Sequence, residues 1–333
     1  MKKNISVPLL CLLLGCTGHS THTSDTGSIE RLDASLDAII SANAKIETIA
    51  TGLDWSEGPL WIEKNKMLLF SDIPQNTIYK WTEEKGKEIY LSPSGYTDTA
   101  KRGGETGSNG LLVDSAGNLV LCQHGNRQIA RMQAPIDKPA ANYISLAANY
   151  QGKRFNSPND AVYNSKGELF FTDPPYGLEK NMADPKKETP YQGVYKLNRN
   201  GSVSLLVDSI TRPNGIAFFP GEKKLIIANS DPEKPYWYLY EIDENGRLQN
   251  GTIFYDASGA GKNLKGLPDG LKIDKKGTVF ASGPGGVWIF TAEGKLLGKI
   301  KLSEATSNCA LSTDEKTLFI TNDMNVLRIK LRD

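Results

Sequence analysis

One phrase recurs six times along this chain, and it constrains the fold more than any other feature. Each copy holds a short apolar run, a turn and a second apolar run. The copies read SEGPLWIEKNKMLLFSD, SNGLLVDSAGNLVLC, PNDAVYNSKGELFFTD, PNGIAFFPGEKKLIIAN, PDGLKIDKKGTVFAS and SNCALSTDEKTLFIT. A period of about 40–50 residues with four short strands per unit is typical of a β-propeller. The sequence therefore predicts an all-β, six-bladed propeller of four-stranded antiparallel blades.

The third unit shows the expected strand pattern within a blade. Its apolar runs predict strands at about 160–164, 168–172, 192–197 and 202–207. The sixth unit supplies only three strands, and we expect the fourth from Lys45–Ala50, which precedes the first phrase. A propeller closed by an N-terminal strand has no open edge between its first and last blades.

The second residue of each phrase begins the innermost strand of a blade. These six residues, which should converge on the channel axis, are Glu57, Asn109, Asn159, Asn214, Asp269 and Asn308. Antiparallel pairing returns the end of the second strand to the same face. We therefore expect a second group of residues around this mouth of the channel: Asp72, His124, Asp173, Asn229 with Ser230, Gly283, and Asn322 with Asp323.

This ring of residues indicates a metal site rather than a set of turns. Asn-Gly and Asp-Gly are common in turns, but Glu57 lies in register with them and glutamate is a poor turn former. Two carboxylates in a narrow channel repel each other, and none of the six positions holds Lys or Arg. Carboxylate and amide oxygens suit a hard divalent cation. Ca²⁺ is favoured, with Mg²⁺ and Zn²⁺ as alternatives, although zinc normally takes His or Cys ligands and the body of the chain holds only His124.

The first 28 residues have the pattern of an export signal and a tether. Two lysines precede an apolar run at 7–14, which is too short to span a bilayer. The run ends in Leu-Leu-Gly-Cys, which is similar to the lipobox of a bacterial lipoprotein. We predict a signal peptide at 1–15, lipid on Cys16 and a flexible tether at 16–28. The protein would then be lipid-anchored in the periplasm or cell envelope.

The propeller domain is assigned to residues 29–333. Apolar residues at helical spacing, from Ile29 to Ile40, predict one short amphipathic helix packed on its outer surface. Cys122 and Cys309 fall in different blades, so two buried free thiols are expected rather than a disulfide. With 39 basic and 38 acidic residues, the charge gives no indication of a nucleic-acid partner. The only membrane contact expected is the lipid on Cys16.

Eight motifs in order resemble those of the senescence-marker-protein, gluconolactonase and regucalcin family of six-bladed propellers, in particular its bacterial gluconolactonase-like branch. They are SEGPLW, SNGLLVD, LCQHGNRQIAR, GKRFNSPND, NSPNDAV, FTDPPYGL, RPNGIAF and LPDGLKID, within a similarity that runs from about residue 30 to 331. The resemblance implies that Glu57, Asn159, Asn214 and Asp269 bind the metal. It also implies hydrolysis of a small-molecule sugar lactone, with a metal-polarised carbonyl and an activated water.

The resemblance points to Asp269 as the base, with His124 as a second catalytic candidate. Asp173, Asn109 and Arg154 are candidates for substrate contact, and the polar loop at 174–192 should influence substrate size. Two other functions stay open. One is a promiscuous arylesterase or phosphotriesterase on the same scaffold. The other is a non-catalytic, calcium-stabilised propeller that binds a ligand, because fold alone does not fix function.

Overall fold

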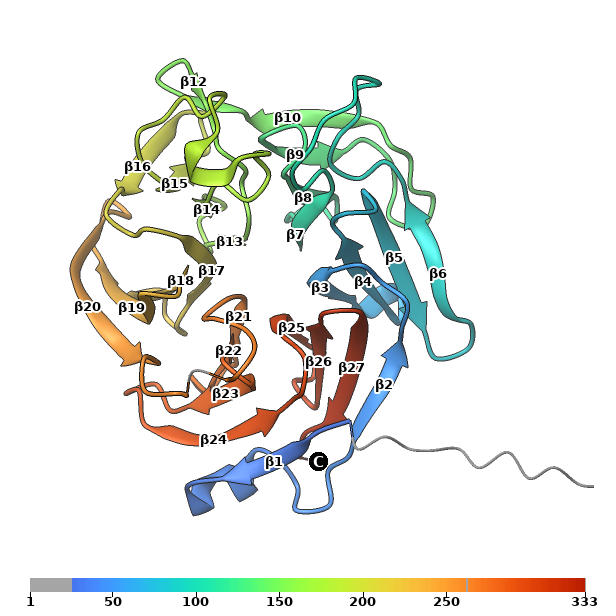
Figure 1. Cartoon of the computed structure of the whole chain (residues 1–333), viewed down its shortest axis with the longest axis vertical. Helices are drawn as coiled ribbons and strands as arrows, with labels where there is room; N and C mark the ends of the chain where they lie inside the picture. Colours follow the sequence, from blue (N-terminus) through green and yellow to red (C-terminus); the bar gives the residue numbers. More distant parts are fainter. Residues whose placement is uncertain (1–25, 262, 333) are drawn as a thin grey trace, which may run out of the picture.

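The chain forms a ring of six β-sheets around a central channel (Figure 1). This computed structural model describes residues 26–261 and 263–332. Each sheet runs radially from an innermost strand to an outermost one, and neighbours in sequence pair antiparallel. The predicted fold class is therefore confirmed.

The first three blades follow the order of the chain. Blade one consists of β3 (Ser56–Ile62), β4 (Met67–Asp72), β5 (Thr77–Thr82) and β6 (Gly86–Leu91). Blade two consists of β7 (Ser108–Val113), β8 (Leu119–Gln123), β9 (Gln128–Met132) and β10 (Tyr143–Ala147). Blade three consists of β13 (Ala161–Tyr163), β14 (Leu169–Asp173), β15 (Gly193–Leu197) and β16 (Val203–Val207), close to the strands predicted there. A small hairpin of β11 (Asn149–Tyr150) and β12 (Lys153–Arg154) precedes blade three.

The remaining blades complete the ring. Blade four consists of β17 (Pro213–Phe218), β18 (Lys224–Asp231), β19 (Lys234–Ile242) and β20 (Leu248–Asp256). Blade five consists of β21 (Leu271–Ile273), β22 (Val279–Gly283), β23 (Gly286–Phe290) and β24 (Leu296–Lys301). Blade six consists of β25 (Thr306–Leu311), β26 (Thr317–Asn322) and β27 (Asn325–Lys330), and β2 (Ile46–Ala50) pairs with β27 as its outer strand. This is the closure that the sequence predicts.

The prediction of one amphipathic helix over residues 29–40 is wrong in its first part. Residues Ser28–Arg31 form β1, which pairs antiparallel with β24 and adds a fifth strand to blade five. Only Ala34–Ala38 is helical, as the 3-10 helix η1, whose first turn is capped by Asp33. The outer edge of β24 offers unpaired backbone groups, and strand pairing there satisfies more of them than a free helix would. The predicted tether also ends earlier, because Ser28 already belongs to β1.

Helical structure in the described part of the chain is limited to three short 3-10 turns. Besides η1 they are η2 (Glu63–Asn65) and η3 (Asn181–Ala183), and none of them could cross a bilayer. The predicted signal peptide, Cys16 and most of the tether lie outside the described residues.

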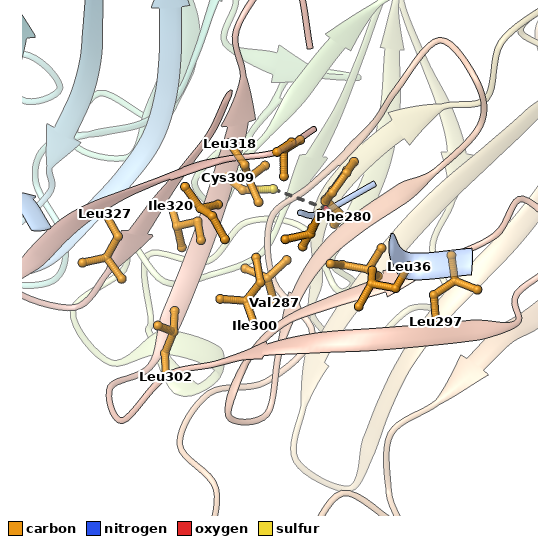
Figure 2. Close-up of a cluster of buried hydrophobic side chains, with 14 residues drawn as sticks. Leu36, Phe280, Val287, Leu297, Ile300, Leu302, Cys309, Leu318, Ile320 and Leu327 are labelled. Atoms are coloured by element: carbon orange, nitrogen blue, oxygen red, sulfur yellow. Dashed lines mark hydrogen bonds between the residues drawn. The ribbon is translucent and has the colours of Figure 1, made fainter. Parts of the chain in front are cut away.

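The apolar cores lie between adjacent blades. The cluster between blades five and six joins Phe280 and Ile300 to Cys309 and Ile320, and it also receives Leu36 of η1 (Figure 2). The thiol of Cys309 donates to the carbonyl of Phe280, at 3.4 Å. Cys122 is buried in a separate cluster between blades two and three. The two cysteines therefore lie in different blades as free thiols, as expected.

Glycine follows the second phrase residue in four blades because the next blade comes into close contact there, through its backbone or, at Gly270, through a side chain. A Cβ on Gly58, whose φ is +52°, would lie 2.0 Å from the carbonyl oxygen of Asn109. A Cβ on Gly270 would lie 1.9 Å from Cγ of Asn308. The glycines therefore allow the inner strands to close into a narrow ring, which brings the polar residues together.

Candidate active site

One end of the channel opens into a cavity of about 350 Å³. Five of the six second phrase residues line it: Glu57, Asn109, Asn159, Asn214 and Asp269. They come from five different blades, as the repeat predicts. The sixth, Asn308, is not part of the lining. Its Oδ1 accepts hydrogen bonds from the backbone of Cys309 and, at 3.4 Å, from Lys272.

Hydroxyl groups fix the inner strands to one another across the blade boundaries. Ser71 donates to the carbonyl of Asn109 at 2.9 Å, and Thr172 donates to the carbonyl of Asn214 at 2.7 Å. Ser230 donates to the carbonyl of Pro268 at 2.6 Å. Because each bond joins one blade to the next, the phrase residues of the cavity are held in or next to inner strands that are fixed to one another.

The oxygens around the cavity fit a divalent cation. Oδ1 of Asn159 and Oδ1 of Asp269 are enclosed and have no hydrogen-bond partner among the described residues. The amide of Asn214 is oriented by its Nδ2, which donates to Ser230 at 2.9 Å. This leaves its Oδ1 available to coordinate a cation. Buried acceptors without partners cost free energy, and a hard cation would satisfy them together.

The charges lead to the same conclusion. Burial raises the pKa of Glu57 to about 8, against the opposing effect of the N–H of Gly58, which donates to its carboxylate. Burial and the charge of Glu57 raise the pKa of Asp269 well above its usual range. Asp160 adds a third buried carboxyl, whose Oδ2 has no partner in the described residues. Lys272 lowers the pKa of Glu57, and Arg212 also lines the cavity. These two cations do not balance the four carboxyl groups of Glu57, Asp160, Asp269 and Glu105.

Within residues 26–261 and 263–332, no three His, Cys, Asp or Glu side chains are grouped to hold a metal ion. A cation in this cavity would therefore depend on the amide oxygens of asparagine as much as on the two carboxylates. Such a ligand set matches Ca²⁺ or Mg²⁺ better than Zn²⁺.

Asp173 lies outside the cavity lining and has structural contacts. It is fully buried, and its two carboxylate oxygens accept hydrogen bonds from the backbone N–H groups of Asn156 and Ser157, both at 2.8 Å. Burial raises its pKa to about 7. Asp72 accepts from the backbone of Asp54 and Trp55 in the same way. The residue at the end of the second strand thus fastens the segment that leads into the first strand of its own blade.

His124 is one residue beyond this fastening position. In blade two Gln123 pairs with Ser108, just as in blade one Asp72 pairs with Ser56. Gln123 therefore occupies the position of Asp72, and the next residue, His124, occupies the position of Ile73. The imidazole is fully buried, and its Nδ1 lies 2.7 Å from Oε2 of Glu105. Glu105 lines the cavity, whereas His124 lies behind it.

Arg154 lies at the surface, away from the cavity. Its backbone N–H donates to Glu188 at 2.7 Å, and its guanidinium donates to the carbonyl of Asn126. The structure therefore brings together the four predicted metal ligands and Asn109 in the cavity lining. His124 is not part of the lining but contacts Glu105, which is. The structure does not bring Asp173 or Arg154 into the same space.

Several cavity residues were not singled out in the sequence. They include Trp55, Glu105, Tyr176 and Arg212. Tyr176 belongs to the predicted loop at 174–192, and burial and the charge of Asp269 raise the pKa of its phenol. Arg212 comes two residues before Asn214, and Glu105 comes four before Asn109. Arg212 is also the first residue of the motif RPNGIAF, whereas for Glu105 proximity to the phrase was the only signal available.

Fold and site together define a class of protein: a six-bladed propeller with carboxylate and amide side chains gathered in a cavity at one mouth of its channel. The chain belongs to the family described as the SMP-30/Gluconolactonase/LRE-like region, whose model matches residues 55–323. The resemblance stated from the motifs is thereby confirmed.

Particular relatives are consistent with this membership. The chain is 39% identical to a gluconolactonase from Zymomonas mobilis over 315 residues, which cover 93% of this chain and 87% of that protein. The structure of a gluconolactonase from Xanthomonas campestris is 29% identical, with a TM-score of 0.77 over 91% of this chain and 95% of that one. The structure of a calcium-binding regucalcin from Agrobacterium tumefaciens, at 16% identity and a TM-score of 0.66 over 86% of this chain and 94% of that one, shares the fold.

Proposed function

We propose that this chain opens a sugar lactone to its hydroxy acid and that it uses one divalent cation, of which Ca²⁺ is the favoured identity. That it is a lactone hydrolase follows from its family and from its identity to a gluconolactonase over most of both chains. The observation that best supports a cation is the pair of enclosed oxygens on Asn159 and Asp269, beside the buried Glu57, that have no hydrogen-bond partner in the described part of the chain.

Each polar residue of the cavity has a task in this reaction. Glu57, Asn159, Asn214 and Asp269 would hold the cation, which when bound supplies Lewis-acid polarisation of the lactone carbonyl. The carboxylate of Asp269 takes a proton from the water that adds to the carbonyl carbon. The bond from that carbon to the ring oxygen then breaks, and Asp269 returns the proton to the ring oxygen, which becomes a hydroxyl. Asn109 offers an enclosed Oδ1 to a donor on the substrate.

A substrate panel with and without a chelator tests this function against its alternatives. Acid release from sugar lactones that stops with chelator and returns with Ca²⁺ is the expected result. Faster turnover of aryl esters or phosphotriesters than of any lactone would favour the promiscuous esterase. Ca²⁺ binding without turnover of any of these compounds would favour the ligand-binding propeller.

Glu57→Gln should weaken cation binding about tenfold or more, because it removes one of two negative ligands and keeps the side-chain shape. The measurement is the calcium content of the dialysed protein and a titration of the chelator-treated protein. The matched control is Glu233→Gln, an exposed change on the hairpin between β18 and β19. Equal cation content in the Glu57 variant and the parent would contradict the assigned ligand set.

We also propose that the protein is exported and anchored through lipid on Cys16, on the basis of the Leu-Leu-Gly-Cys sequence that ends the apolar run. Cys16→Ala should move the protein from the membrane fraction to the soluble fraction or leave it unprocessed. Mass spectrometry of the mature protein provides the check. A mature chain that still begins at Met1 would refute the proposal.

A further inference from the structure

We propose that Glu105 binds the hydroxyl groups of a polyhydroxylated lactone and that His124 positions it for this task. This role presupposes the proposed lactone hydrolysis and adds to it the residues that recognise the hydroxyl groups of the substrate. Glu105 would therefore determine specificity, separately from the residues that hold the cation or move the proton.

The carboxylate of Glu105 is available to a ligand in the cavity. Its side chain is 36% exposed and forms part of the cavity wall, together with Asn109 and Glu57. One oxygen, Oε2, is held by Nδ1 of His124 at 2.7 Å. Across the described residues, neither Lys nor Arg makes an ion pair with Glu105, and Oε1 has no hydrogen bond there. A residue that lines the space where the substrate would lie thus keeps an acceptor that its neighbours do not use.

The imidazole of His124 fixes the orientation of this carboxylate. A carboxylate can only accept, so Nδ1 carries the proton of the bond that joins them. His124 has no exposed surface, and its Nε2 has no partner within the described residues. A buried imidazole with a single polar contact holds that one contact in place, as a positioning residue does for a binding group.

The loop that carries Glu105 is also fastened to its neighbours. Arg102 donates hydrogen bonds to the carbonyls of Gly125 and Gly177 and lies over the ring of Tyr96. Gly177 packs closely on His124, because a Cβ on this glycine would lie 2.9 Å from Cβ of the histidine. The segments around 102–105, 124–125 and 177 therefore form one packed unit, and Glu105 is ordered before a substrate arrives.

The charges around Glu105 select the kind of group it can bind. Glu105 shares the cavity wall with Glu57, Asp269 and Arg212, and its negative charge contributes to the raised pKa of the two other carboxyl groups. A carboxylated or phosphorylated substituent placed there would be repelled. A hydroxyl group donates a charge-assisted hydrogen bond to such a carboxylate, and this bond is stronger than one between neutral groups. The chemistry thus favours an uncharged lactone with several hydroxyl groups.

Two probe lactones with the same ring separate this role from general catalysis. Glucono-1,5-lactone carries hydroxyl groups, and δ-valerolactone has the same six-membered ring without them. For Glu105→Gln we expect kcat/KM on glucono-1,5-lactone to fall roughly 10- to 100-fold, mainly through KM, as the loss of a charged hydrogen bond implies. The kcat/KM on δ-valerolactone should stay within about threefold, since that lactone makes no such bond. Glu233→Gln is the matched control and should change neither value.

The possible results distinguish this role from the proposed function itself. A parent enzyme that opens neither lactone would refute the proposed function. A parent that opens both, with an equal loss on both in Glu105→Gln, would refute the specificity role and leave lactone hydrolysis standing. If Glu105→Gln lost activity on neither lactone, the specificity role would also be refuted.

His124 has its own test, through the same ratio of rates. His124→Phe removes the bond to Glu105 and should lower the preference for glucono-1,5-lactone about as much as Glu105→Gln does. The double variant should be no less selective than either single one, because the two residues act as a unit. His124→Asn, whose amide can still donate, should recover part of the preference. Additive losses, or an unchanged preference in a folded His124→Phe, would contradict the positioning role.

Discussion

Asp269→Asn should lower turnover on a sugar lactone by roughly 10²–10⁴-fold, the usual cost of removing a general base. The variant keeps an oxygen and nearly the same shape at a position where Oδ1 is enclosed and unpartnered. It loses both the negative charge and the ability to accept a proton from water. Because Asp269 also belongs to the proposed cation ligands, turnover has to be measured at saturating Ca²⁺ with the cation content verified.

Glu57→Gln is the matched comparison for this prediction. It removes the same charge from the same ligand set but takes away no proposed base. At saturating Ca²⁺ we expect it to recover much more turnover than Asp269→Asn does. His124→Asn gives a second comparison, since a base role for His124 would make that variant the slower one. A cation-loaded Asp269→Asn that hydrolyses lactone at the parental rate would exclude Asp269 as the base, while leaving the fold unaffected.

The propeller fold could be predicted from the sequence because the same pattern of strands and turns recurs six times in it. Strand pairing, the closing strand Ile46–Ala50 and the convergence of five phrase residues all depend on that repeat. The N-terminal segment is different, because it occurs once. Leu36 and Ile40 are buried, as the apolar spacing of a helix would require. Ser28–Arg31, however, pairs with the free edge of β24 and forms a strand. Local periodicity cannot show which sheet edge a segment will meet.

The candidate site was predictable to the extent that it lies on the repeat. Glu57 and Asp269 occupy equivalent positions of the phrase, whereas Glu105 and Tyr176 belong to connecting loops outside the phrase. Asp173 illustrates a different limit, since its topological position at the mouth was predicted but its hydrogen bonds were not. Which backbone N–H groups a carboxylate meets depends on the path of the preceding segment, here Asn156 and Ser157. That path is a tertiary feature, which the phrase itself does not encode.

Removing the cation should make the stability of the protein fall as pH rises from about 5.5 to 8. Burial raises the pKa of Glu57 from 4.5 to about 8 in the folded, cation-free protein. Within this window the unfolded chain has released a proton that the folded protein keeps, so deprotonation favours unfolding as pH increases. Asp269 acts in the same direction. The effect has an upper bound on the order of several kcal/mol, equivalent to a shift in Tm of about 10 °C.

Added Ca²⁺ should reverse this trend, because it binds the deprotonated carboxylates and so stabilises the folded protein more at pH 8 than at pH 5.5. Thermal melts at several pH values, with chelator or with excess Ca²⁺, provide the measurement. Carboxyl groups with a lowered pKa, such as Asp33, titrate below the window and do not contribute to it. Glu57→Gln is the control: with chelator present, its Tm should depend less on pH than that of the parent. A chelated parent whose Tm rises between pH 5.5 and 8 would show that Glu57 and Asp269 are already ionised without a cation. Charge neutralisation in the channel would then not be the reason for a cation to bind.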